Sequence, residues 1–174
     1  MGGFGGGNGG GGAAVLITSG TLGAGVATID ITSIPSGYSR FELQVSGGAT
    51  DGTTDYPNLR LNADAGANYD GVIVRSTGAA VSTTTRLAAN EFQIQQWGKS
   101  SDKVSSIKIT IFNRNTGVLG KPILAEWYAK GNTYPHESEY GAWLNLTDEI
   151  NRITLAAAVA NYTTGTSYAL FGYK

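Results

Sequence analysis

Short runs in which apolar and polar residues alternate, separated by turn-forming residues, most constrain the fold of this chain. Residues Arg40–Val45 alternate strictly, and Ser106–Phe112 do so with three isoleucines on one face. Because successive side chains of a β-strand point to opposite faces, each such run has one face to bury. The runs that we predict to be strands are Ala14–Ser19, Val26–Thr32, Arg40–Val45, Asn58–Asn62, Phe92–Trp97, Ser106–Phe112, Ile123–Ala129, Tyr140–Leu146, Arg152–Leu155 and Ser167–Tyr173. About ten strands at this spacing are typical of an all-β, antiparallel β-sandwich of jelly-roll-like form.

Sequence that favours a helix is scarce. Asp148 and Glu149 suit the start of a helix in the segment Thr147–Ala160, but the isoleucines of this segment fit a turn that leads into a strand equally well. We predict the turn and the strand. The two longest irregular stretches are expected to be Gly47–Pro57 and Asn62–Arg86, and loops of this length in a compact domain are usually functional or packed against a neighbour.

The chain divides into a glycine-rich arm, residues 1–12, and one β-sandwich domain, residues 13–174. The arm contains nine of the 26 glycines. Ordering glycine costs backbone entropy that an arm with only Phe4 to bury cannot offset by itself. We therefore predict that the arm attaches the protein to an assembly, and a flexible leader is the alternative. The residues assigned to this attachment are Gly2, Gly3, Phe4, Gly5 and Asn8.

Charge balance, cysteine content and N-terminal composition exclude several classes of partner and location. The chain has 12 Lys and Arg against 13 Asp and Glu, so it lacks the positive field that gathers phosphates or anionic lipids, and we expect neither nucleic acid nor membrane as a partner. The absence of cysteine rules out disulfides, thiolate nucleophiles and cysteine-bound metals. The N-terminus has neither the basic residues nor the apolar run of a signal peptide, so synthesis in the cytoplasm of the producing cell is expected.

The carboxylates and the single histidine form no recognisable catalytic arrangement in the sequence. Hydrolysis of a glycosidic bond needs two carboxylates at one site, and nothing in the sequence brings two of them together. The candidates are Glu126, Glu137, Glu139 and Asp148. His136 lies in what reads as a proline-initiated loop, without an identifiable nucleophile or orienting partner. We predict no catalytic residue, no cofactor and no enzymatic activity.

The segment 62–70 is the candidate metal site, because oxygen ligands at short alternating spacing suit Ca²⁺. Its oxygen-bearing residues are Asn62, Asp64, Asn68 and Asp70. Ile73 stands where an EF-hand places its closing glutamate. Asn, Asp and Gly also form Asx turns that need no metal. We predict such turns and no metal site, and calcium binding is the alternative.

Aromatic residues supply a second set of candidates, since flat amphipathic rings stack on sugars or anchor protein interfaces. Trp127 is in phase with the apolar residues of its predicted strand, which favours a place in the core. Trp97 is out of phase and is predicted to face outward. The candidates for an interface or a glycan platform are Trp97, Tyr134 and Trp143. Core or subunit interface is the favoured interpretation.

Four motifs follow one another along the folded part of the chain. They are Ile34–Leu43 (IPSGYSRFEL), Leu59–Tyr69 (LRLNADAGANY), Ile150–Leu155 (INRITL) and Gly165–Tyr173 (GTSYALFGY). Their order resembles a widespread group of tailed-bacteriophage virion proteins, which carry the patterns "IPqtY-x-x-L", "L-x-fN-x-D-x-g-x-NY", "I-x-x-I-x-L" and "G-(T/S)-x-(F/Y)-x-L-(Y/F)-G". The match spans residues 26–174 and omits the arm.

The resemblance implies a β-sandwich module on the virion surface and no catalytic residues. Such modules occur in capsid decoration and head-fibre proteins and in tail-fibre and receptor-binding proteins. The Asn-x-Asp part, which is Asn-Gly-Asp in family-like sequences, is Asn62-Ala63-Asp64 in this chain. The residues that we expect to hold this loop together by hydrogen bonds are Asn62, Asp64, Asn68 and Tyr69.

We therefore predict a non-enzymatic virion protein, a capsid decoration or head-fibre protein attached through its N-terminal arm. The alternative is a tail-fibre or receptor-binding adhesin that binds carbohydrate. The expected partners are the major capsid or tail protein and further copies of this chain, with a trimer favoured. A host-surface glycan is the candidate ligand of the alternative.

Overall fold

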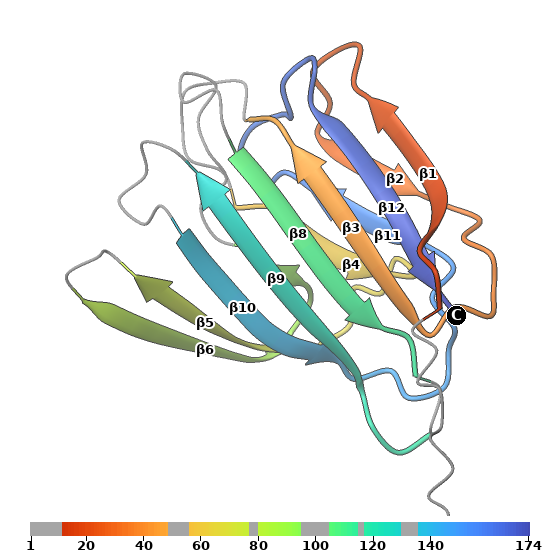
Figure 1. The fold of residues 1–174 in the computed structure, drawn as a ribbon. Helices are drawn as coiled ribbons and strands as arrows, with labels where there is room; N and C mark the ends of the chain where they lie inside the picture. The colour runs from red at the N-terminus through yellow and green to blue at the C-terminus, as the bar shows by residue number, and fades with distance from the viewer. Residues whose placement is uncertain (1–11, 49–55, 77–79, 95–104, 115–116, 130–135) are drawn as a thin grey trace, which may run out of the picture.

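The computed structural model describes residues 12–48, 56–76, 80–94, 105–114, 117–129 and 136–174. Within these ranges the chain forms twelve strands in two antiparallel sheets (Figure 1). The strands are β1 Val15–Thr21, β2 Thr28–Ile31, β3 Arg40–Ser46, β4 Asn58–Leu61, β5 Tyr69–Ser76, β6 Val81–Ala89, β7 Phe92–Gln93, β8 Ser105–Phe112, β9 Lys121–Ala129, β10 His136–Trp143, β11 Ile153–Ala156 and β12 Ser167–Tyr173. The predicted all-β sandwich is therefore confirmed.

The two sheets are unequal in width. The large sheet has the order β1-β12-β3-β8-β9-β10-β5-β6, and the small sheet has the order β2-β11-β4-β7. In Figure 1 the large sheet lies in front and the small sheet behind it. Because the small sheet has half as many strands, it cannot cover the whole inner face of the large one. The strand β6 shows this, since most of its residues are exposed.

The core lies between the two sheets and is built from the inward positions of the alternating strands. The large sheet supplies Ile107, Ile109 and Ile111 from β8, each at most 2% exposed. The small sheet supplies residues such as Leu59 and Leu155, which are fully buried in the same cluster. Trp127 is also in this core, as its phase predicts.

Two predictions about local structure were wrong. The stretch Asn62–Arg86, expected to be irregular, contains β5 and most of β6. The strand signal in this stretch is weak because β6 is an exposed threonine-rich edge strand with little apolar alternation. His136, expected in a loop, is the first residue of β10, whose pairing with β5 and β9 continues to that residue.

Other local predictions agree with the structure. The segment Thr147–Ala160 begins with an irregular connection and continues into β11, and no helix occurs in the described ranges. Accordingly, no helix among the described residues is long and apolar enough to cross a membrane. The strand predicted at Phe92–Trp97 is limited to β7, and its last three residues lie outside the described part.

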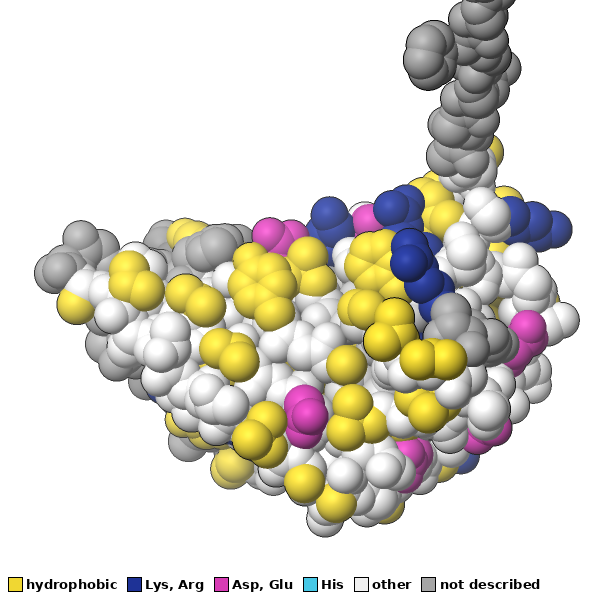
Figure 2. Space-filling view, turned by 90° about the horizontal axis from the view of Figure 1, so that it is seen from below, with side chains coloured by type: hydrophobic (Ala, Val, Ile, Leu, Met, Phe, Trp, Pro, Cys, Tyr) yellow, Lys and Arg dark blue, Asp and Glu magenta, His cyan; other side chains and the backbone are white. Residues whose placement is uncertain are grey.

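The large sheet has two ends that differ in character. At one end β1 begins and β12 finishes, and Gly12, the first described residue, lies there against Lys174. We call this end the "arm end". Exposed apolar side chains gather at this end, in the β8–β9 connection and after β10 (Figure 2). We call them the apolar patch, and they are Val118, Leu119, Leu144 and Leu146. The opposite end, where β1, β3 and β9 finish, is the far end.

Candidate functional site

The segment from Leu61 to Tyr69 forms a hydrogen-bonded turn at the arm end. The turn closes with a bond from the amide of Asp64 to the carbonyl oxygen of Leu61, at 3.0 Å. Its two central residues, Asn62 and Ala63, have φ of 53° and 57°. This left-handed conformation suits Asn and disfavours Ala, so the turn is strained at Ala63.

Asn62 joins this turn to the segment before β11. Its side-chain nitrogen donates to the carbonyl oxygen of Glu149 at 2.8 Å. Its side-chain oxygen accepts from the amides of Asn151 at 2.9 Å and Arg152 at 3.2 Å. One asparagine side chain thus satisfies three backbone groups that are 87 to 90 residues away in sequence.

Asp64 is the centre of the turn. Its carboxylate accepts hydrogen bonds from Trp143 Nε1 at 2.7 Å, from the amide of Gly66 at 2.8 Å and from Asn68 Nδ2 at 2.9 Å. Partial burial acts to raise the pKa of Asp64, but these hydrogen bonds hold it below its ordinary value. The Tyr69 hydroxyl accepts from the amide of Leu61 at 2.9 Å, and burial raises the pKa of Tyr69 to about 12.

Of the four predicted loop residues, Asn68 and Tyr69 donate hydrogen bonds to Asp64, whereas the Asn62 side chain bonds to the segment before β11. Both carboxylate oxygens of Asp64 accept hydrogen bonds from the protein. Across the described ranges, no three His, Cys, Asp or Glu side chains gather in a way that suits a metal ion. Trp143, predicted as an interface or glycan aromatic, is 1% exposed and belongs to the core. Its burial agrees with the core interpretation and not with a glycan platform, because the Trp143 indole is held inward by Asp64.

The other predicted site residues lie outside the described residues. They are the arm residues Gly2, Gly3, Phe4, Gly5 and Asn8 and the aromatic residues Trp97 and Tyr134.

Two carboxylates that the sequence left apart both point into the sandwich from β10. Glu137 and Glu139 are 0% and 1% exposed, on the inner face of the large sheet. Glu137 has Arg75 Nε 3.6 Å from its Oε1. Gly71 makes room for Glu139, because a Cβ at Gly71 would lie 2.5 Å from Glu139 Oε1.

These interior groups are poorly satisfied. Within the described part of the chain, four buried atoms here have no hydrogen-bond partner: both carboxylate oxygens of Glu137, Oε2 of Glu139 and Nε1 of Trp127. Burial raises the pKa of Glu137 to about 7, against the opposing effect of Arg75. Burial raises the pKa of Glu139 to about 8. Both carboxyl groups therefore hold a proton in mildly acidic solution.

The outer face of the large sheet carries a third feature, at its far end. The register places five hydroxyl-bearing residues opposite one another on consecutive strands. This hydroxyl row consists of Tyr128 on β9, Ser106 on β8, Ser46 on β3, Ser167 on β12 and Thr21 on β1. A polar row lies next to it on three of these strands and consists of Glu126, Lys108 and Gln44.

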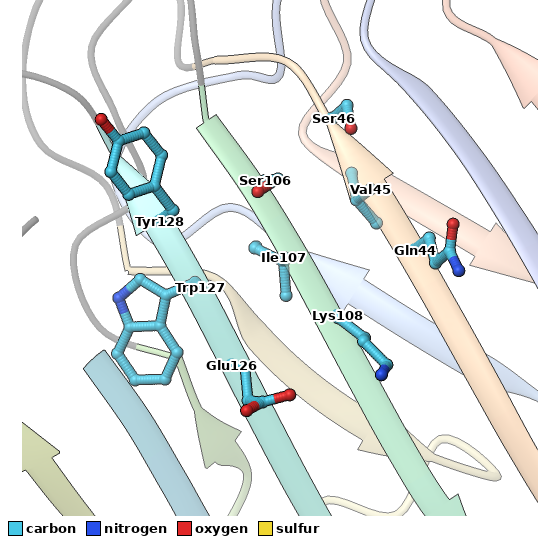
Figure 3. Close-up of a pocket in the computed structure, with 9 residues that line it drawn as sticks. All are labelled: Gln44, Val45, Ser46, Ser106, Ile107, Lys108, Glu126, Trp127 and Tyr128. Carbon is cyan, nitrogen blue, oxygen red and sulfur yellow. The ribbon is translucent and has the colours of Figure 1, made fainter. Parts of the chain in front are cut away.

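Two adjoining hollows follow the hydroxyl row. The first lies over β9, β8 and β3, and the second over β3, β12 and β1, each with a volume of about 340 Å³. They share Gln44 and Ser46, so they form one groove across five strands. Figure 3 shows the first hollow, with the Tyr128 ring at one side, Ser46 and Gln44 on β3 at the other, and the small Ser106 side chain between them.

Two residues of the polar row interact with Glu42, which lies outside the groove. Gln44 Nε2 donates to Glu42 Oε1 at 2.7 Å, and Lys108 Nζ lies 3.9 Å from Glu42 Oε2. Sequence reasoning missed this groove. Alternation identified the outward positions of β3 and β8, but it did not show that Ser46 and Ser106 share one row.

No known family model matches the chain, and no curated protein sequence matches it. Among solved structures, an exo-inulinase from Aspergillus awamori is similar at 12% identity and a TM-score of 0.44. That match covers 91% of this chain and 29% of the inulinase chain, so the chain spans less than a third of it. The alginate lyase Aly36B is similar at 10% identity and a TM-score of 0.28, over 92% of this chain and 78% of the lyase. Likenesses this weak assign neither a family nor an activity.

Proposed function

We propose that this chain is a non-enzymatic structural protein of a tailed-bacteriophage virion, a capsid decoration or head-fibre protein attached through residues 1–12. One observation carries the proposal: Gly12, which is the root of the arm, and the apolar patch are at the same end of the sandwich. Gly12 lies against Lys174 at the finish of β12, and the β8–β9 connection lies at the same end because Phe112 is opposite Arg40.

The composition of the arm end supports attachment to protein. Val118 and Leu119 are 77% and 67% exposed, and clustered apolar side chains on a surface mark contact sites. A hollow beside Gly12 is lined by Arg40, Tyr173 and Lys174, among others, and Arg40 stacks over the Tyr173 ring at 3.8 Å. Arginine and aromatic residues are enriched at protein interfaces.

The positions of the family-like motifs support a scaffold more than a chemical site. The motif Leu59–Tyr69 forms the turn at the arm end, and Ile150–Leu155 supplies its partners. The motif Gly165–Tyr173 forms β12 between β1 and β3. The carboxylates with raised pKa, Glu137 and Glu139, are buried away from any substrate in solution. This burial favours a role other than catalysis.

The copy number per virion tests this proposal. Purified particles are digested and the chain is quantified by mass spectrometry against the major capsid protein and a tail protein. A copy number in proportion to the capsid protein is expected for a decoration or head-fibre protein. Absence from purified particles would overturn the virion assignment.

We further propose self-association, with a trimer favoured, because the apolar patch leaves large side chains exposed on the single chain. Light scattering at micromolar concentration is expected to give a multiple of the 18.1 kDa chain mass. A single species at the chain mass, both free and after release from particles, would contradict this.

A second candidate function is a tail-fibre or receptor-binding adhesin, and the groove on the outer face favours it. Tyr128 is 42% exposed beside a row of hydroxyl groups, and exposed rings beside polar groups suit sugar binding. A copy number in proportion to a tail protein would select this function over decoration.

A further inference from the structure

We propose that the groove formed by the hydroxyl row and the polar row binds an uncharged, linear polysaccharide laid across β9, β8, β3, β12 and β1. The proposal rests on the second candidate function and names its ligand class. It is tested on the purified protein, whereas copy number tests the location on the virion, so the two can fail separately.

The shape of the groove suits a chain-like ligand. Neighbouring strands are spaced about 4.8 Å apart, so five strands give the row a length of roughly 19 Å. The first hollow lies over one end of this row and the second over the other, and they meet at Ser46. The serine side chains are short, which leaves an open path along the row. A single small molecule would fill only part of it.

The chemistry of the groove suits hydroxyl groups. A serine or threonine hydroxyl both donates and accepts hydrogen bonds, as sugar hydroxyls do. Ser46, Ser106 and Thr21 are exposed and repeat once per strand. Tyr128 adds a partly exposed ring at one end, and a flat ring offers an apolar face to the C–H groups of a sugar.

The charge of the groove selects an uncharged polymer. Lys108 is engaged with Glu42, and Glu126 lies next to Lys108 in the same row. These three groups sum to one negative charge, which repels phosphate, sulfate or uronate chains.

The backbone disfavours a peptide strand as the ligand. Each of β8, β3 and β12 is paired with a strand on both sides, so these strands offer no edge for strand addition. Recognition on this face must come from side chains.

The place of the groove fits a surface function. It lies at the far end, whereas Gly12 and the apolar patch lie at the arm end. A protein held by its arm therefore keeps the groove away from the attachment surface.

The test is affinity electrophoresis of the full chain in native gels that contain dextran, mannan, galactan or xylan, with polygalacturonate as the charged probe. Retardation by at least one uncharged polymer is expected. Tyr128→Ala is expected to weaken this binding about tenfold, the value of one ring contact. Ser106→Gln, which fills the floor of the groove, is expected to weaken it as well.

Tyr140→Ala is the matched control. Tyr140 is 53% exposed on the same face, opposite Val72 and Leu124 and outside both hollows. Its variant is expected to bind like the parent protein. The proposal is overturned if none of the uncharged polymers retards the protein, if only polygalacturonate does, or if the Tyr128 and Tyr140 variants lose binding equally.

Discussion

Buried polar side chains at the arm end and at the far end of the sandwich differ in whether they have hydrogen-bond partners. At the arm end, Asp64 accepts three hydrogen bonds, and the buried Lys121 donates to the carbonyl oxygen of Asn145 at 2.9 Å. Toward the far end, among the described residues, Glu137 and the Trp127 indole are buried without hydrogen-bond partners. Within the described ranges Arg60 Nε, beside the turn, is also buried without a hydrogen-bond partner, so the contrast concerns the carboxylates: Asp64 is fully bonded and Glu137 is not.

The difference indicates which end is stabilised by hydrogen bonds and which end carries the free-energy cost of buried, unbonded polar atoms. Unsatisfied buried polar groups are expensive, and natural proteins keep them mostly where function requires them. The arm end combines its network with the apolar patch and the root of the arm. The far end combines its unmet interior groups with the groove on the outer face. The proposed attachment therefore uses the end that carries the hydrogen-bond network, and the proposed glycan binding uses the other end.

The largest expected effect comes from removing the arm. Deletion of residues 2–12 is expected to abolish binding to particles that lack the protein, because the proposed anchor is gone. Its thermal unfolding should stay close to that of the parent chain, since the core lies between the sheets. Pelleting with particles and calorimetry measure the two quantities. Tyr128→Ala, altered at the far end, should bind particles normally. Retained occupancy after the deletion would remove the arm from the attachment.

Asp64→Ala is expected to lower the free energy of unfolding by about 3 kcal/mol, because it leaves the buried Trp143 indole N–H without its acceptor and frees two further donors. Denaturant unfolding measures this loss. Asp30→Ala is the matched control, since Asp30 forms a partly exposed ion pair with Arg152, and its loss should cost less than about 1 kcal/mol. Equal costs for both variants would contradict the central role of the turn.

Glu139→Gln tests the far end through pH. The unfolded carboxyl titrates near 4.5 and the folded one near 8, so between these values the folded chain holds a proton that the unfolded chain releases. The stability of the parent chain should therefore fall as pH rises through this window. The stability of the variant should fall less over this window. Above pH 8 its free energy of unfolding should exceed that of the parent chain by about 2 kcal/mol.

The measurement is denaturant unfolding from pH 5 to about pH 9. Glu126→Gln, on the outer face of the adjacent strand β9, is the control and should leave the pH profile of the parent chain in place. A Glu139 variant with the same pH profile as the parent would show that burial of this carboxyl carries no cost.

The smallest expected effect is a gain at the arm end. Ala63→Gly should relieve the left-handed conformation of Ala63 and raise the free energy of unfolding by about 0.5 kcal/mol, after the entropy that glycine adds to the unfolded chain. Ala65→Gly, in the same turn but without a positive φ, should instead be neutral or destabilising. Denaturant unfolding gives the free energy of unfolding of both variants. A gain in Ala63→Gly alone would show relief of backbone strain, whereas equal changes in both would show a general effect of glycine.

The all-β class and most strands can be predicted from the sequence alone, because period-two alternation reports which face of a strand is buried. The sequence also indicated the residues of the turn at Asn62 and Asp64, since local side-chain hydrogen bonds leave a local signature. It missed β5, because Gly71 takes an inward position and Val72 and Val74 lie outward, so apolar and polar residues do not alternate there. It missed β6, because this exposed edge strand has no core face to produce alternation.

Which residues of different strands lie together depends on the tertiary structure. Strand order and register bring Ser46, Ser106 and Ser167 into one row, although more than 50 residues separate each from the next along the chain. They also turn Trp143 inward onto Asp64 and place Glu137 beside Arg75. The physical reason is that pairing between distant strands is fixed by the packing of the whole core, whereas alternation within a strand reports only that strand's own two faces.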